Sequence, residues 1–152
     1  MKILDTLKEG AIIAELSATD KKAVLEELTG TLAEASGVNH EEMVRVLLER
    51  ERLGSTGIGG GIAIPHGKLK PLQSLLMAFG RSRKGVDFDA MDGKASHLFF
   101  LLLAPEDSTG AHLKMLARIS RSLKSSVFRE RLMNAADVRE LYLVIQREDE
   151  DF

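Results

Sequence analysis

Apolar residues recur at helical spacing early in the chain. Val24, Leu28 and Leu32 follow one another every four residues, and Leu25 widens this stripe into a band that faces a core. Glycine at position 37 then stands where the end of a helix favours a left-handed residue. The pattern predicts a helix over residues 20–36.

A second helix is predicted from Asn39 to about Arg52. Asparagine is a good N-cap, and Glu42 follows it three residues later, as in a capping box. The apolar face of this helix is formed by Met43, Val44, Leu47 and Leu48.

In the middle of the chain, the spacing of the apolar residues changes to that typical of β-strands. Residues 62–64 and 75–79 are short β-prone segments, and residues 86–88 and 97–103 flank the Asp-Gly turn signal at 92–93. This arrangement predicts a hairpin around that turn. The apolar run that begins at Leu98 does not alternate with polar residues, which predicts a central strand buried on both faces.

Three further helices are predicted after Pro105. The first begins near Ser108 or Thr109, and the others span residues 126–134 and 137–147. One face of the first helix carries His112, Leu116, Ile119 and Leu123. Because helices and strands interleave, the predicted fold class is α/β, with a mixed β-sheet sandwiched between helices in a single domain over residues 1–152. Residues 146–152 are rich in acids, and we expect them to form a flexible tail.

Composition and charge narrow the possible chemistry. The chain has 152 residues, with 21 Lys and Arg against 23 Asp and Glu, and this balance argues against nucleic-acid binding. The longest apolar run, residues 98–104, is far shorter than the roughly 20 residues that span a bilayer, so no stable membrane insertion is expected. The first residues lack the apolar stretch of a signal peptide. We therefore expect a cytoplasmic protein, and the sequence does not specify its oligomeric state.

Residues 54–68 are the strongest local signal for a functional site. The sequence G-S-T-G-I-G-G-G-I-A-I-P-H-G-K combines glycines, two hydroxyls and His66. Glycines let backbone N–H groups approach an anion closely. The segment matches neither the Walker A loop nor the dinucleotide-binding G-x-G-x-x-G pattern. It is a candidate phosphate cradle beside an imidazole.

Three roles are open to His66 on the residues alone: metal ligand, general base or nucleophile. The four histidines are scattered and the chain has no cysteine, so no metal site and no cofactor are predicted. The G-x-S-x-G elbow of serine hydrolases is missing. A phosphoryl-accepting histidine needs only a neutral ring, nearby donors and access. A structural histidine that is hydrogen-bonded within a tight turn is the competing interpretation.

His112 and Arg50 are candidate partners of His66. His112 lies in the first turn of its predicted helix, where free N–H groups and the helix dipole favour an anion. Arg50 lies just before the glycine-rich segment, where its charge would neutralise a phosphate. His40 and His97 are expected to be structural.

Residues 51–67 resemble the active-site signature of enzyme IIA domains of the fructose/mannitol class in the bacterial phosphotransferase system. The pattern R-E-R-L-G-S-T-G-I-G followed by I-A-I-P-H-G-K-L is most similar to the nitrogen-regulatory branch of that family. Residues 105–116 also resemble the family. The restricted positions that agree are Glu51, Ile58, Gly59, Ile62, Ala63, Ile64, Pro65, His66 and Gly67.

This resemblance implies a role for each candidate residue. His66 would accept a phosphoryl group on Nε2 from an HPr-like phosphohistidine protein, and His112 would help to hold that group. Arg50 would match the arginine near the site, and Ser55 and Thr56 are positioned to add hydroxyl donors. The implied activity is that of a phosphoryl carrier more than of a classical enzyme.

Three functions remain open from the sequence. The first is a phosphocarrier that regulates target proteins through its phosphorylation state. The second is a sugar-transport subunit that passes phosphate to a fructose- or mannitol-type IIB domain. The third is a binding module whose His66 is never phosphorylated.

Overall fold

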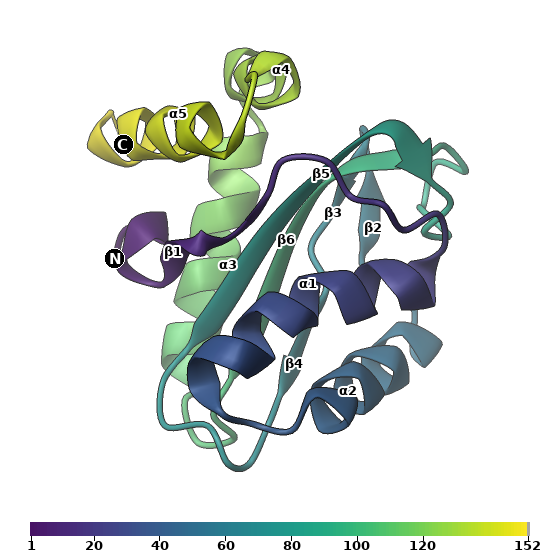
Figure 1. The fold of residues 1–152 in the computed structure, drawn as a ribbon, viewed down its shortest axis with the longest axis vertical. Coiled ribbons are helices and arrows are strands. Elements are labelled where there is room, and N and C mark those ends of the chain that lie inside the picture. Colours follow the sequence, from purple (N-terminus) through teal and green to yellow (C-terminus); the bar gives the residue numbers. More distant parts are fainter. Residues whose placement is uncertain (152) are drawn as a thin grey trace.

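A mixed β-sheet lies between two layers of helices (Figure 1). The computed structural model describes residues 1–151. The strands are β1 Leu7–Ile13, β2 Gly57–Gly59, β3 Ile62–Ala63, β4 His66–Lys68, β5 Leu76–Val86 and β6 Ser96–Ala104. The helices are the 3-10 turn η1 Ile3–Asp5, α1 Lys21–Ser36, α2 His40–Arg52, α3 Thr109–Leu123, α4 Ser126–Asn134 and α5 Val138–Glu150.

Strand β6 is the centre of the sheet. The strand order is β1-β5-β6-β3-β2, and β4 also pairs with β6. Strands β3 and β4 run parallel to β6, whereas β5 runs antiparallel to it. Helices α1 and α2 cover one face of the sheet, and α3, α4 and α5 cover the other (Figure 1). The predicted α/β class with a mixed sheet between helices is confirmed.

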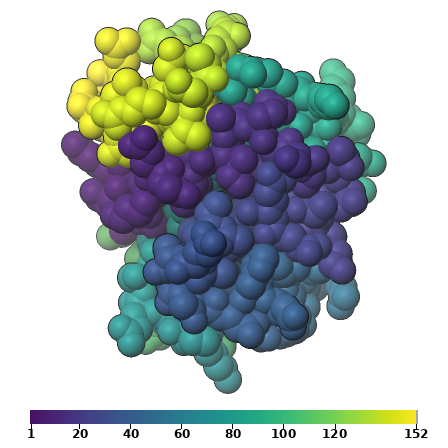
Figure 2. Space-filling view, in the orientation of Figure 1, coloured from purple at the N-terminus to yellow at the C-terminus, as the bar shows by residue number. Residues whose placement is uncertain are grey.

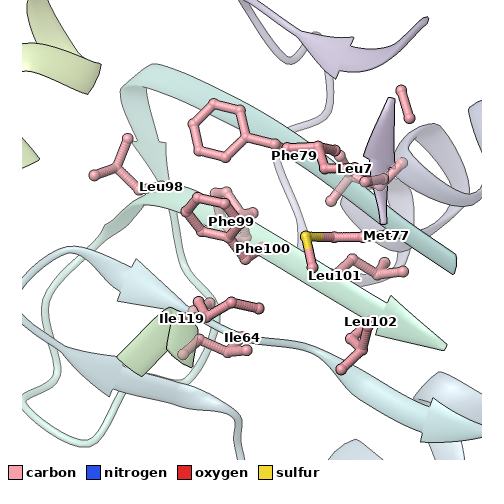
Figure 3. Packing of buried hydrophobic residues seen from close by; sticks show 14 of the residues in the cluster. Leu7, Ile64, Met77, Phe79, Leu98, Phe99, Phe100, Leu101, Leu102 and Ile119 are labelled. Atoms are coloured by element: carbon pink, nitrogen blue, oxygen red, sulfur yellow. The ribbon is translucent and has the colours of Figure 1, made fainter. Parts of the chain in front are cut away.

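The burial of β6 on both faces is also confirmed. Residues 98–103 are at most 2% exposed, because helices lie over both sides of this strand. Their side chains meet those of β5 and α3 in one cluster, in which Phe79 and Phe100 form an edge-to-face pair with ring centroids 4.8 Å apart (Figure 3). The core therefore lies around β6 and holds the site's elements together.

The first two helices follow the predicted local signals closely. Asp20 caps α1 by accepting a hydrogen bond from the N–H of Ala23, and Gly37 ends the helix with φ 72°. The side chain of Asn39 caps α2 by accepting from the N–H of Glu42 at 2.9 Å. Local capping chemistry was sufficient to place both helices.

Two predicted short strands, residues 75–79 and 86–88, proved to be wrong as separate elements. A single strand, β5, runs from Leu76 to Val86, and it forms the hairpin with β6. The polar residues 81–84 concealed its continuity. Arg81 is nevertheless 1% exposed, because its guanidinium donates to the carbonyls of Ala14, Leu132 and Ala135. Strand β1, an edge strand with an irregular register against β5, was not predicted.

The prediction of a flexible tail over residues 146–152 was wrong for the part that the structure describes. Helix α5 continues to Glu150, and Phe152 lies outside the described residues. Asp149 is 5% exposed, and its carboxylate accepts hydrogen bonds from the N–H groups of Ile3 and Leu4 at 2.9 Å and from Arg118 at 3.0 Å. One acid of the run therefore faces inward and joins the two ends of the chain.

The contact between the chain ends is visible on the surface as well. In the space-filling view, the N-terminal segment lies directly against α5 (Figure 2).

Within residues 1–151, no helix has both the length and the apolar character needed to cross a membrane.

We expect Asp149→Asn to lower the free energy of unfolding by about 3 kcal/mol, because it removes the charge of the buried carboxylate that pairs with Arg118. Urea unfolding followed by circular dichroism measures this change. Glu150→Gln, an exposed change on the same helix, should stay within about 0.5 kcal/mol. Equal losses in the two variants would contradict a stabilising role for the Asp149 contacts.

Candidate functional site

The glycine-rich segment folds into a small hairpin, and it does not form a cradle at His66. Strands β2 and β3 pair around Gly59, Gly60 and Gly61, whose φ angles are 94°, 67° and 80°. This turn requires residues that adopt positive φ, which explains the glycines. The N–H of Gly60 donates to the side chain of Asp92. Glycines 59–61 therefore serve this turn.

The register of the sheet separates that turn from His66. Ile62 pairs with Leu98 of β6, whereas His66 pairs with Leu102. Four residues along a strand correspond to roughly 13 Å. His66 itself begins the short strand β4.

The hydrogen bond of His66 defines which of its ring nitrogens carries the proton. Nδ1 lies 2.7 Å from the carbonyl oxygen of Ile64. A carbonyl only accepts, so Nδ1 carries the proton and donates it, and Nε2 of the neutral ring keeps its lone pair. Burial is the main cause that lowers the pKa of His66 below its ordinary 6.5, and the positive charge of Arg50 lowers this pKa further. These features favour a neutral ring with an unprotonated Nε2.

His112 lies beside His66, as predicted. The two ring centroids are 5.6 Å apart, and the rings are nearly perpendicular at 73°. His112 is 6% exposed on the first turns of α3, and its Nε2 has no hydrogen-bond partner among the described residues. Burial lowers the pKa of His112, and the nearby His66 and Lys68 lower it further. A buried ring nitrogen without a partner is ready to bind a ligand.

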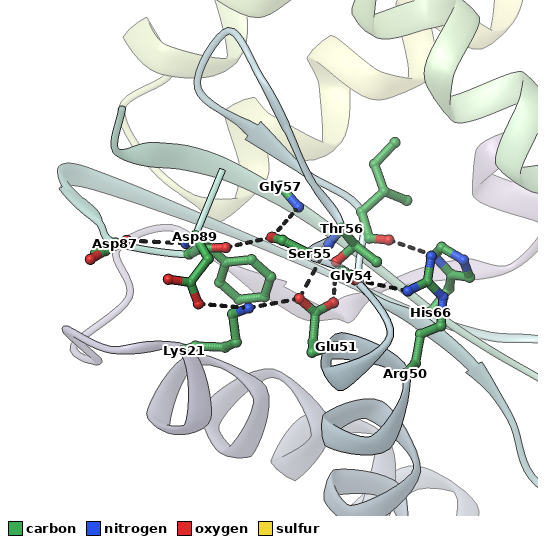
Figure 4. Close-up of polar contacts among 12 residues, drawn as sticks. Lys21, Arg50, Glu51, Gly54, Ser55, Thr56, Gly57, His66, Asp87 and Asp89 are labelled. Atoms are coloured by element: carbon green, nitrogen blue, oxygen red, sulfur yellow. Dashed lines mark hydrogen bonds and ion pairs between the residues drawn. The ribbon is translucent and has the colours of Figure 1, made fainter. Parts of the chain in front are cut away.

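Arg50 reaches the same site from the end of α2. Its Nη1 donates a hydrogen bond of 2.8 Å to the carbonyl of Gly54, and Figure 4 shows its guanidinium beside the His66 ring. The predicted trio of His66, His112 and Arg50 is thus brought together from β4, α3 and α2.

Ser55 and Thr56 are occupied by other partners. The hydroxyl of Ser55 donates to the carbonyl of Phe88 at 2.6 Å, and the hydroxyl of Thr56 donates to the carboxylate of Glu51. Each hydroxyl has a single proton, so neither donates to an anion in this conformation. In this structure both residues hold the segment before β2, and their role as phosphoryl donors stays a prediction.

Two residues of the site, Lys68 and Glu51, were given no role from the sequence, although Glu51 was named as a position of the family signature. The ammonium of Lys68 donates to the hydroxyl of Thr109 at 2.8 Å, at the start of α3, and its charge reaches His112. Lys68 stands two residues after His66, a spacing that places both side chains on one face of a strand. Glu51 is 8% exposed and lies four residues after Leu47, where it continues the apolar stripe of α2. An acidic residue on an apolar stripe was the feature of the sequence that could have identified Glu51 as a buried, functional side chain.

The other two histidines are structural, as expected. His40 Nε2 lies 3.0 Å from the carbonyl of Glu26 and 2.8 Å from the hydroxyl of Thr29, and His97 Nδ1 lies 2.8 Å from the carbonyl of Ser82. No cluster of three or more acidic, histidine or cysteine side chains suited to a metal ion occurs among residues 1–151.

The sheet and site together define an α/β domain that presents one neutral imidazole beside a second, buried imidazole. Residues 5–148 match the family described as "Phosphoenolpyruvate-dependent sugar phosphotransferase system, EIIA 2". The chain belongs to this family, and its resemblance to the fructose/mannitol class is confirmed.

Individual relatives agree with this assignment. A nitrogen regulatory protein of Bradyrhizobium diazoefficiens is 42% identical over 145 residues, which cover 95% of each chain. The fructose-specific EIIABC component of Bacillus subtilis is 35% identical over 150 residues, which cover 98% of this chain and 24% of that protein. The crystal structure of the nitrogen regulatory protein IIA-Ntr from Neisseria meningitidis is 36% identical, with a TM-score of 0.87 over 93% of this chain and 97% of that one.

We expect Arg50→Gln to raise the pKa of His66 toward 6.5, because a nearby positive charge disfavours the imidazolium form. NMR titration of the His66 ring resonances measures this shift. Arg52→Gln removes an exposed charge from the same helix and serves as the matched control. An unchanged His66 pKa in Arg50→Gln would show that the arginine does not act on the ring.

Proposed function

We propose that this chain is a phosphocarrier of a phosphoenolpyruvate-dependent phosphotransferase system that accepts a phosphoryl group on Nε2 of His66. The observation that carries this proposal is the 2.7 Å hydrogen bond from Nδ1 to the Ile64 carbonyl, which leaves Nε2 unprotonated. The donor is a phosphohistidine protein of the HPr type. Membership of the EIIA family supports this assignment.

The transfer step uses only groups that the two proteins supply. The lone pair of Nε2 attacks phosphorus and forms a new P–N bond, while the P–N bond of the donor breaks and its electron pair returns to the donor imidazole. Nδ1 of His66 keeps its proton throughout. The Ile64 carbonyl then faces a ring that has become more positive, and this contact stabilises the phosphorylated state.

Three neighbours stabilise the transferred group. His112 turns its unpartnered Nε2 to the phosphoryl oxygens as a hydrogen-bond donor. Arg50 from α2 adds positive charge near His66, and Lys68 from β4 adds positive charge near His112. The burial that keeps both rings neutral in the resting state also strengthens these contacts once the anion is bound.

The regulatory role is the function we favour. Relatives that match along nearly their whole length carry the name nitrogen regulatory protein. Phosphorylation adds close to two negative charges at the surface around His66, and such a change alters which proteins bind there. We propose that target proteins distinguish the two states of this chain.

Sugar transport is the second candidate function. It is favoured by the similarity to the fructose-specific EIIABC component of Bacillus subtilis. In that case the phosphoryl group would pass to a IIB domain. None of these 152 residues is a cysteine, so a thiol acceptor would lie outside them. Chasing labelled phosphate from this chain onto purified fructose- and mannitol-type IIB domains separates the candidates, because only the transport function predicts rapid loss of label.

His66→Ala is expected to abolish phosphorylation. The protein is incubated with labelled phosphoenolpyruvate, the first enzyme of the phosphotransferase system and HPr, and acid-labile label is then counted. Substitution of the structural histidine, His40→Gln, should leave the label at the wild-type level. Label that persists in His66→Ala would falsify the assignment of the acceptor.

His112→Ala is expected to slow phosphorylation of His66 by about 100-fold, because it removes a donor that is aimed at the transferred anion. Rapid-quench measurement of label against time gives the rate. Thermal unfolding should remain cooperative in this variant. A wild-type rate, or loss of the fold, would instead assign His112 to the core.

A further inference from the structure

Glu51 is a buried carboxylate whose contacts lead toward His66. Its side chain is 4% exposed, and Oε1 lies 3.0 Å from the ammonium of Lys21. The N–H of Thr56 donates to Oε1 at 3.2 Å, and the hydroxyl of Thr56 donates to Oε2. A buried charge is tolerated only when it is paired and hydrogen-bonded, so these contacts define where Thr56 stands.

Lys21 holds this carboxylate from the side of α1. Its ammonium also lies 3.0 Å from the carboxylate of Asp89 and 4.8 Å from the ring centroid of Phe88. The carbonyl of Phe88 in turn accepts the hydroxyl of Ser55. The two residues before β2 are therefore held both by the helices and by the segment that follows β5 (Figure 4).

Two further hydrogen bonds connect Thr56 to the His66 ring. The carbonyl of Thr56 accepts the N–H of Ile64 at 3.0 Å, and the carbonyl of Ile64 accepts Nδ1 of His66 at 2.7 Å. The contacts form a continuous path from Glu51 through Thr56 and Ile64 to the ring. Thr56 therefore holds the backbone N–H of the same residue whose carbonyl binds the ring.

We propose that Glu51, anchored by Lys21, is a positioning residue that orients the Ile64 carbonyl and so keeps the proton of His66 on Nδ1. This inference rests on the proposed acceptance of phosphate at Nε2. A neutral imidazole exchanges between two tautomers, and the hydrogen bond made by one nitrogen selects between them. If the carbonyl turned away, part of the population would carry the proton on Nε2 and would have no lone pair there.

The tautomer of the ring tests this role without any phosphorylation. In ¹⁵N-labelled full-length protein at a pH where the ring is neutral, wild-type His66 should show a protonated Nδ1 and an unprotonated Nε2. In Glu51→Gln we expect a mixture of the two forms. Glu49→Gln changes an exposed carboxylate on the same helix and should keep the wild-type spectrum.

Thr56 supplies a second pair of variants in case Glu51→Gln fails to fold. Thr56→Val keeps the shape of the side chain but removes the hydroxyl that binds Glu51, so it should also mix the tautomers. Thr56→Ser restores that hydroxyl and should restore the wild-type spectrum. A lower melting temperature with an unchanged His66 spectrum in Glu51→Gln and Thr56→Val would overturn the proposal, because it would assign Glu51 a purely stabilising role.

The rate of phosphorylation then tests whether the tautomer of His66 affects the reaction. Among folded variants, Glu51→Gln should lower the maximal rate of phosphorylation by HPr in proportion to the fraction of His66 that carries the proton on Nε2, about 2-fold for an equal mixture, with little change in the HPr concentration at half-maximal rate. An unchanged rate despite mixed tautomers would overturn the proposed positioning role. If wild-type protein accepts no phosphate at all, the proposed function fails, while the ring spectra still decide whether Glu51 sets the tautomer.

Discussion

The pairing of the central strand β6 is the constraint on which the site depends. His66 is in register with Leu102 of this strand, and the chain leaves β6 to form α3, which carries His112. The buried residues 98–103 leave no room for a shift in register, because a slip by one residue would turn every side chain to the opposite face. Packing on both faces of β6 is therefore what places the two imidazoles side by side.

Buried charged side chains add to the constraints that the apolar core places on the arrangement of the elements. Arg81, Glu51 and Asp149 all lie inside the protein, and each is paired or hydrogen-bonded to groups far away in the sequence. Asp149 joins the last helix to the first turn of the chain, and Glu51 holds the segment that leads into the site. Because an unpaired buried charge is costly, these contacts favour one arrangement of the elements over others.

The sequence-based predictions were accurate where the interacting residues are close in the sequence, and they failed where those residues are far apart. Helices α1 and α2 were placed correctly because Asn39, Gly37 and the apolar stripes act within a few residues. Strand β5 was predicted as two separate strands, because the partners that allow Arg81 to be buried lie more than 50 residues away in the sequence. The acidic end was misjudged for the same reason, since the contacts of Asp149 with Ile3 and Leu4 leave no local signal.

The sequence by itself determined the α/β class, the burial of the central strand and the family signature around His66. Only the tertiary structure decided which histidine nitrogen is free, that His112 lies 5.6 Å from His66, and that the hydroxyls of Ser55 and Thr56 bind within the protein. Hydrophobic periodicity and capping are properties of neighbouring residues, so they can be recognised in the chain. The direction of a hydrogen bond depends on a carbonyl or carboxylate that folding brings from elsewhere, and it is decided only when the sheet has assembled.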